Sequence, residues 1–163
     1  MTVRYITEKD DPLEISEIYE QSWKFAYKGI IPQSFLDSIP HGKWVKHLGR
    51  EEMRSLVIDE DGKLTGTASF CASRWENFKG YGELVSIYLL PQYIGSGRGA
   101  ALISEALKGI AEAGFKKAVL WVLEDNRRAR RFYEKNGFLC TEVYLENDIG
   151  GKLLREVAYT LDL

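Results

Sequence analysis

Three glycines alternate with other residues in the segment Ile94-Gly95-Ser96-Gly97-Arg98-Gly99-Ala100. A glycine-rich turn that leads into a helix can bind an anion, because the first helical N–H groups have no intrahelical partner and lie at the positive end of the helix dipole. Glycine also lets a phosphate approach the backbone and permits positive φ. The segment therefore predicts a main-chain site for a diphosphate, with the Arg98 side chain adding charge or facing solvent.

Taken alone, this segment has other readings. Gly95 to Ala100 also satisfies G-x-G-x-x-A, the dinucleotide-binding fingerprint, and a tight structural turn is a third interpretation. The dinucleotide fingerprint normally follows its strand directly, with an acidic residue about 20 positions later. Here Pro91 to Ile94 separate the expected strand from the turn, and Lys116 and Lys117 occupy the later region. These features argue against a dinucleotide site, and no G-x-x-x-x-G-K-[ST] sequence is present to form a P-loop.

The periodicity predicts elements that would hold this turn in place. Asp11 and Pro12 predict a helix start, Gly99 to Gly114 reads as an amphipathic helix, and Asn126 predicts the cap of a helix ending at Asn136-Gly137. Shorter helical stretches are expected over 33–39 and 43–48. Strands are expected over 3–6, 55–59, 64–73, 83–90, 118–123, 138–145 and 153–161, the last two flanking a turn over 147–151.

Composition bounds the function classes. The chain has 163 residues, which predicts one domain over 1–163, and its net charge of -2 gives no electrostatic footprint for nucleic acid. Without an apolar leader or a run of about 20 apolar residues, a cytoplasmic protein that does not enter the membrane is expected. Cys71 and Cys140 leave one disulfide open, although two reduced core thiols are the simpler interpretation. His41 and His47 lack metal-site spacing, so no metal is expected, and no G-x-S-x-G element suggests a serine hydrolase.

Two motifs resemble those of a known family. The stretch from Gly82 to Leu102, a strand followed by the glycine segment and a helix, resembles motif A of the GNAT superfamily of N-acetyltransferases. The stretch Asn126-Arg127-Arg128-Ala129-Arg130-Arg131-Phe132-Tyr133-Glu134-Lys135-Asn136-Gly137-Phe138 is similar to motif B, and Ser22 to Pro32 resembles the first-helix region. One departure is Ile94, which stands where the family carries Gln or Arg. The resemblance implies an α/β GNAT-like fold, with a twisted, mostly antiparallel sheet of about seven strands flanked by helices.

The resemblance also implies an activity and a cofactor site. It implies transfer of an acetyl group from acetyl-CoA to a primary amine of a small molecule, an amino acid or a peptide N-terminus, without a covalent enzyme intermediate. Main-chain groups of Ile87, Tyr88 and Leu89 would hold the pantetheine arm and the acetyl carbonyl, and residues 94–100 would hold the diphosphate. The Asn126 side chain would lie near the pantetheine amides. Tyr133 would be the general acid that protonates the departing sulfur, and the arginines Arg127, Arg128, Arg130 and Arg131 would face solvent or the 3′-phosphate of CoA.

The sequence gives only candidate residues for the group that accepts the amine proton and for the site that binds the amine. Glu83 lies eleven residues before Ile94, where some family members carry a glutamate base, and alternation along the strand would put it on the face of Val85, Ile87 and Leu89. It could act as the base if burial raises its pKa toward neutrality, and ordered water is the alternative. Four aromatic side chains of the first helices, Trp23, Phe25, Tyr27 and Phe35, are candidates to line the amine site. A CoA-binding module without turnover remains the alternative function, and a homodimer is left open.

Overall fold

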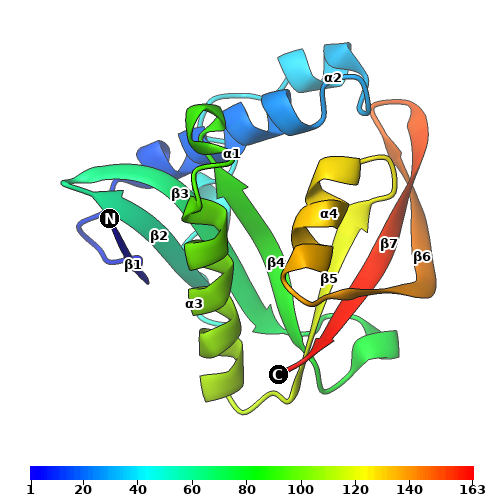
Figure 1. The fold of residues 1–163 in the computed structure, drawn as a ribbon. Coiled ribbons are helices and arrows are strands. Elements are labelled where there is room, and N and C mark those ends of the chain that lie inside the picture. The colour runs from blue at the N-terminus through cyan, green and yellow to red at the C-terminus, as the bar shows by residue number, and fades with distance from the viewer.

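A seven-stranded sheet organises the chain (Figure 1). The computed structural model describes residues 1–163. The strands are β1 (Thr2–Tyr5), β2 (Arg54–Glu60), β3 (Lys63–Ala72), β4 (Gly82–Leu89), β5 (Lys117–Leu123), β6 (Leu139–Ile149) and β7 (Lys152–Asp162). The helices are α1 (Pro12–Ala26), α2 (Gln33–Asp37), α3 (Arg98–Glu112) and α4 (Arg127–Lys135). The strand order is β1-β2-β3-β4-β5-β7-β6, and only β4 and β5 pair in parallel. This arrangement confirms the mostly antiparallel GNAT-like fold.

Helices cover both faces of the sheet. Figure 1 shows α3 and α4 in front of the strands, where α3 buries Leu102, Ile103, Ala106 and Ile110 in the largest core cluster. On the other face, Ile15, Ile18 and Tyr19 of α1 pack on Val57, Leu64 and Leu90 in a second cluster. Both helices follow the 3.6-residue apolar period that the sequence shows. No helix is long and apolar enough to cross a lipid bilayer.

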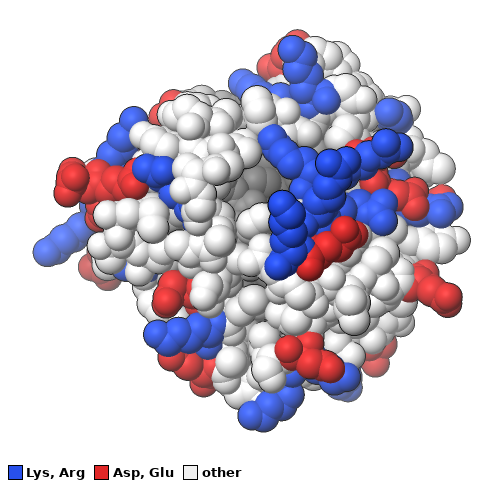
Figure 2. Space-filling view, in the orientation of Figure 1, with Lys and Arg blue, Asp and Glu red and all other residues white.

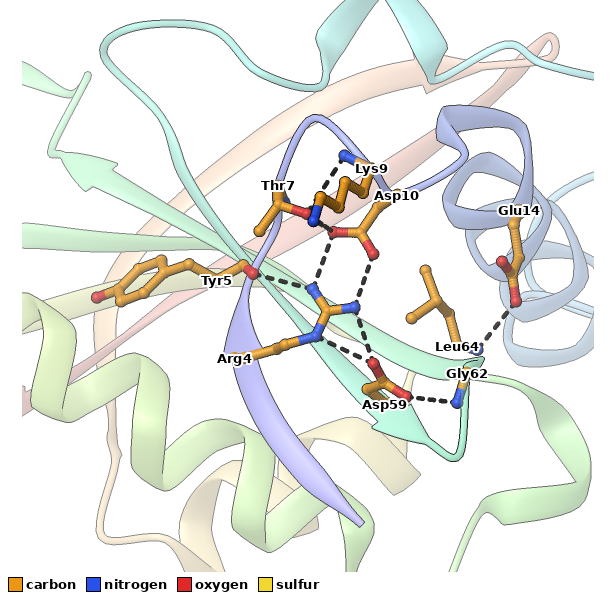
Figure 3. Close-up of polar contacts among 9 residues, drawn as sticks. All are labelled: Arg4, Tyr5, Thr7, Lys9, Asp10, Glu14, Asp59, Gly62 and Leu64. Carbon is orange, nitrogen blue, oxygen red and sulfur yellow. Dashed lines mark hydrogen bonds and ion pairs between the residues drawn. The ribbon is translucent and has the colours of Figure 1, made fainter.

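The start of the chain is tied to the sheet by charged groups (Figure 3). The Arg4 guanidinium of β1 lies between two carboxylates, with its Nη2 2.7 Å from Asp10 Oδ1 and 2.9 Å from Asp59 Oδ2. Hydrogen bonds from Arg4 hold the pKa of Asp10 well below its usual range. Asp11 caps α1 by accepting from the Leu13 N–H at 2.9 Å, as the sequence predicts. Glu14 accepts from the Leu64 N–H at 2.9 Å, so the first turn of α1 is fixed to β3.

A bulge in β4 changes which side chains share a face. In the β3–β4 register Ser69 opposes Ser86 and Phe70 opposes Leu84, so Val85 is an extra residue without a partner. Glu83, Ser86 and Tyr88 therefore pair with one face of β3 (Cys71, Ser69 and Thr67), and Leu84, Ile87 and Leu89 with the other (Phe70, Ala68 and Gly66). The expectation that Glu83 shares a face with Ile87 and Leu89 is wrong, because simple alternation does not survive an inserted residue.

Three further expectations need correction. The stretch 43–48 forms only a single 3-10 turn over Val45–His47, since Gly42 and Gly49 bound it with positive φ and leave too few residues for an α-helix. Strand β6 continues to Ile149, so the turn shrinks to Gly150 and Gly151, which both have positive φ as a tight two-residue hairpin turn requires. Cys71 is a buried free thiol, whereas Cys140 is exposed on the edge strand β6 and is not a core residue.

Candidate active site

A single large cavity opens where β4 and β5 diverge. The two strands pair only through Gly82 with Ala118 and Glu83 with Val119, and beyond that point they separate. The resulting cavity has a volume of about 1010 Å³ and is bounded by side chains from both faces of the sheet. Its walls come from α1, the start of α3, α4, β4, β5, β7 and the loop after β3.

The glycine segment forms one end of this cavity. Gly95 and Gly97 adopt φ of 82° and 85°, a left-handed conformation that glycine adopts without steric cost. Gly97 precedes α3, whose first backbone hydrogen bond runs from the Ala101 N–H to the Gly97 carbonyl at 3.2 Å. The Gly99 and Ala100 N–H groups precede that bond and have no backbone partner. Ile94, Gly95, Gly97, Gly99 and Ala100 line the cavity, so unpaired donors and open backbone fit a diphosphate.

Two side chains of the segment turn away from the cavity. The Ser96 hydroxyl donates to the Tyr93 carbonyl oxygen, and Ser96 is not part of the cavity wall. The Arg98 guanidinium pairs with Glu60, with its Nη2 2.8 Å from Glu60 Oε1, and stacks 4.5 Å from the centre of the Tyr93 ring. The main-chain groups of residues 94–100 that face the cavity are called the glycine cradle below. The Arg98 side chain neither adds charge to this cradle nor faces solvent; it ties the start of α3 to the end of β2.

Basic side chains of α4 flank the opening. Figure 2 shows a hollow between α3 and α4 with Lys and Arg side chains along its α4 side. Arg128, Arg131 and Lys135 belong to the cavity wall. Arg130 instead donates to the Tyr159 hydroxyl at 2.9 Å and the Glu124 carbonyl at 3.1 Å, and Arg127 does not contribute to the wall. The basic band therefore comes from three residues, and these fit an anionic ligand held across the opening.

Asn126 and Tyr133 of α4 also line the cavity. Asn126 is 7% exposed, and its Oδ1 caps α4 by accepting from the Ala129 N–H at 3.2 Å. Its amide NH₂ makes no hydrogen bond within the protein and is free to donate. Burial and the neighbouring Tyr88 raise the pKa of Tyr133, whose hydroxyl is therefore protonated at neutral pH. Both positions suit groups that contact a ligand threading between β4 and β5.

The wall along β4 presents main-chain groups. Ile87, Tyr88 and Leu89 all line the cavity on the stretch that has left β5. Ser22 of α1 donates from its Oγ to the Leu89 carbonyl at 2.6 Å. The Leu90 N–H of the same peptide bonds to the Thr65 carbonyl of β3 at 3.0 Å, so the Leu89 carbonyl points away from β3. A strand edge without a partner strand offers N–H and C=O groups to an extended ligand.

Glu83 lies at the base of the gap, 2% exposed and with its carboxylate fully engaged. Its Oε1 accepts from Arg74 Nη2 at 2.7 Å and Trp75 Nε1 at 3.1 Å, and its Oε2 accepts from the Arg74 main chain and Nε at 3.1 Å each. Burial acts to raise the pKa of Glu83, but the Arg74 hydrogen bonds outweigh it and the pKa lies below its ordinary value. The condition set for a glutamate base, a pKa raised toward neutrality, is therefore not met.

Aromatic side chains form the end of the cavity on the α1 face. Trp23 Nε1 donates to the Tyr88 hydroxyl at 3.1 Å, and the Tyr27 and Tyr88 hydroxyls lie 3.3 Å apart. Burial raises the pKa of Tyr88 to about 12 and also raises the pKa of Tyr27 well above its ordinary value, so both are neutral phenols. Of the four aromatic residues that the sequence suggests, Trp23 and Tyr27 line the cavity. Phe25 lies on the exposed side of α1 under Arg128. Phe35 of α2 packs against the buried cluster that includes Leu123 and Leu154, and neither phenylalanine is part of the wall.

Sequence reasoning missed several wall residues. Arg74 and Trp75 follow β3, Trp121 lies on β5 against Trp75, and Glu156 lies on β7. The Trp121 indole N–H is buried without a partner. None of these positions belongs to a motif, and only the folded register brings them together. A weak signal exists in Glu156, a carboxylate between the buried Leu154 and Ala158 on the same face of β7.

No group of three or more His, Cys, Asp or Glu side chains is arranged to hold a metal ion.

The profile of the Acetyltransferase (GNAT) family matches residues 14–138. The chain is 32% identical to the uncharacterized N-acetyltransferase YuaI of Bacillus subtilis, covering 72% of this chain and 69% of that protein. It is 26% identical to the spermidine N(1)-acetyltransferase of Thermoplasma acidophilum, covering 79% and 83%.

Among solved structures, the fold matches yncA of Salmonella typhimurium, a putative acetyltransferase crystallised with its cofactor acetyl-CoA. The TM-score is 0.76 at 23% identity, over 99% of this chain and 92% of that one. The profile match spans most of the chain, including the glycine segment and α4. The chain therefore belongs to the GNAT family and is an N-acetyltransferase.

Proposed function

We propose that the protein transfers an acetyl group from acetyl-CoA to a primary amine of a small molecule, an amino acid or a peptide N-terminus. One observation carries the proposal: a continuous cavity runs from the glycine cradle, past Tyr133, to the aromatic end on the opposite face of the sheet. A donor entering between α3 and α4 and an amine entering from the α1 face would meet where β4 and β5 part. The acetyl-CoA thioester supplies the activated acyl group.

The donor end is assigned by charge and by unpaired donors. The N–H groups at the start of α3 bind the diphosphate, and Arg128, Arg131 and Lys135 neutralise phosphate charge at the opening. The free amide NH₂ of Asn126 donates to a pantetheine carbonyl, and the gap-facing main chain between Ile87 and Leu89 pairs with the pantetheine arm. The same main chain offers an N–H to polarise the acetyl carbonyl.

Tyr133 protonates the sulfur that leaves. The amine nitrogen forms the new C–N bond as the C–S bond breaks, and the Tyr133 hydroxyl proton passes to the sulfur. Because its pKa is raised, Tyr133 holds its hydroxyl proton at neutral pH and can donate it when the C–S bond breaks.

Water, and not Glu83, takes the amine proton in this proposal. A carboxylate whose pKa lies below its ordinary value and whose oxygens already accept four hydrogen bonds has little tendency to bind a further proton. Glu83 instead fixes Arg74 and Trp75 on the cavity wall. The acidic limb of the pH–rate profile should then follow the ionisation of the amine.

Calorimetry with acetyl-CoA, followed by a free-thiol assay across a panel of amines, tests the function. Acetyl-CoA and CoA should both release heat on binding, NAD should not, and at least one primary amine should accelerate thiol release. Folded protein that gives no heat with either CoA compound would refute the donor assignment. Binding of acetyl-CoA without amine-dependent thiol release would instead support the CoA-binding module.

A further inference from the structure

Two carboxylates belong to the cavity wall, and their surroundings differ. Glu83 is neutralised by Arg74, whose Nη2 lies 2.7 Å from Glu83 Oε1. Glu156 forms no ion pair, and its one hydrogen bond comes from the Asn147 side chain amide at 2.7 Å. Its neighbour Arg155 is engaged elsewhere, with Glu146 at 3.2 Å. Glu156 is therefore the uncompensated negative charge of the cavity.

The strand register fixes where this charge lies. Glu156 opposes Leu123 in β5, and Leu154 and Ala158 share its face of β7. Leu123 and Leu154 belong to the apolar cluster that includes Trp23 and Tyr27, and Ala158 packs beside Trp121. Glu156 thus lies on the aromatic face of the sheet, opposite the face of α3 and α4, at the acceptor end of the cavity.

Glu156 and the proposed acid lie on opposite faces of the sheet. Tyr133 packs against the core cluster that α3 buries. Glu156 shares its face with Leu154, a member of the cluster that Tyr27 packs against. A group bound at Glu156 therefore lies away from the Tyr133 side of the cavity.

From this arrangement we propose that Glu156 binds a second ammonium group of the acceptor, so that the substrate class is aliphatic amines with a second positive charge. The inference rests on the proposed function. The amine that attacks must be neutral, and a carboxylate beside it would hold it protonated, whereas a remote carboxylate suits a charge that stays. The Tyr27 and Tyr88 side chains offer aromatic rings and hydroxyl oxygens to the same cation. An acceptor with a carboxylate in this position meets like charge.

A matched pair of acceptors and a matched pair of variants test the proposal. Butylamine and 1,4-diaminobutane share a four-carbon chain and differ by one ammonium group. The wild-type protein should use the diamine with a kcat/KM about tenfold or more higher, since a hydrogen-bonded charge pair in a partly buried site has this strength. Glu156→Gln should abolish that preference by raising the KM for the diamine to about the KM for butylamine. Glu146→Gln, which removes an exposed carboxylate of the same hairpin, should keep the preference.

Other results would overturn the assignment. These are an equal kcat/KM for the two amines, a preference for L-alanine over the diamine, or a preference that survives Glu156→Gln. If the Gln variant does not fold, the wild type decides: raising NaCl from 50 to 500 mM should weaken use of the diamine selectively, and equal weakening of both amines refutes the charge pair.

Equilibrium binding separates this inference from the proposed function. Calorimetry of 1,4-diaminobutane on the CoA complex should show binding that is lost in Glu156→Gln, whether or not turnover occurs. Acetyl-CoA binding and thiol release with equal diamine affinity in both proteins would leave the acetyltransferase proposal intact and refute the role of Glu156.

Discussion

The cavity changes character between its glycine end and its aromatic end. At the glycine end the contacts offered are main-chain N–H groups at the start of α3 and the free edge of β4, held by backbone geometry. At the other end they are side chains from α1, the loop after β3, β5 and β7. A contact made by a main-chain group survives most substitutions of that residue, whereas a contact made by a side chain is lost when the side chain is replaced. Under the proposed function, this difference predicts that donor binding is set by the fold, and acceptor choice by a few separate residues.

The largest effect is expected when the Tyr133 hydroxyl, which lies between the glycine end and the aromatic end of the cavity, is removed. Tyr133→Phe should lower kcat by about 10²-fold with every amine, because no other hydroxyl replaces the proton donor. The KM values for acetyl-CoA and for the amine should change little. Steady-state thiol release measures both, and Tyr144→Phe, which alters an exposed tyrosine of β6, serves as the control. An unchanged kcat would remove Tyr133 from the role of acid.

A change at the glycine end should affect the donor alone. Gly97→Ala strains a backbone with φ of 85° by about 1–2 kcal/mol, and the resulting shift of the cradle should raise the KM for acetyl-CoA about tenfold. Gly114→Ala is the matched control, since φ is 96° there and an added Cβ likewise meets no atom within 4 Å, but it lies at the far end of α3. The two variants should lose similar stability by denaturant titration. An equal effect of both on KM would contradict the assignment of the cradle.

At the acceptor end, Glu83→Gln should act on stability and on the amine. Losing the charge that holds Arg74 and Trp75 should lower the free energy of unfolding by about 1–3 kcal/mol and raise the amine KM several-fold. The pKa of Glu83 is lowered on folding, so its stabilisation is fully present above the unfolded pKa of about 4.3 and is lost as pH falls through the folded value. The free energies of unfolding of the wild type and Glu83→Gln, measured by denaturant titration, should therefore differ by a constant amount between pH 6 and 8. In stronger acid the two values should converge.

The same variant also tests the choice of base. The shape of its pH–rate profile should match that of the wild type if water accepts the amine proton. Loss of the acidic limb would restore Glu83 as the base.

The smallest expected effect concerns the tie between α3 and β2. Glu60→Gln should weaken the contact to Arg98 and raise the KM for acetyl-CoA about two- to threefold, since the pair is mostly but not fully buried. Glu105→Gln breaks an exposed pair with Lys108 on the same helix and should leave the KM unchanged. Initial rates at varied acetyl-CoA concentration distinguish the two variants, and indistinguishable KM values would show that Arg98 does not position the cradle.

Sequence was informative where chemistry depends on neighbours in the chain. The glycine cradle and the Asn126–Tyr133 face of α4 are local patterns, and both line the cavity; their roles in binding CoA and in catalysis stay predictions. The orientation of Glu83 could not be predicted, because a one-residue bulge at Val85 leaves no mark in the alternation of residue types. Glu156 and Trp121 were missed for another reason: they reach the cavity only through pairing of β5 with β7, and such long-range register is not encoded in a short motif.

The tight turn between β6 and β7 has a consequence for redesign of the protein. Gly150 sits against the Phe35 ring, where an added Cβ would approach the Phe35 Cβ to 2.7 Å, and Lys152 Nζ donates to the Ile30 carbonyl at 3.0 Å. The hairpin tip thus packs against α2 and the segment before it, and Ile149, next to the tip, lines the cavity. Because strand residues alternate with a period of two, inserting residues there in pairs preserves the inward direction of Glu156. Laboratory evolution toward bulkier amines would best begin by exchanging this tip together with α2.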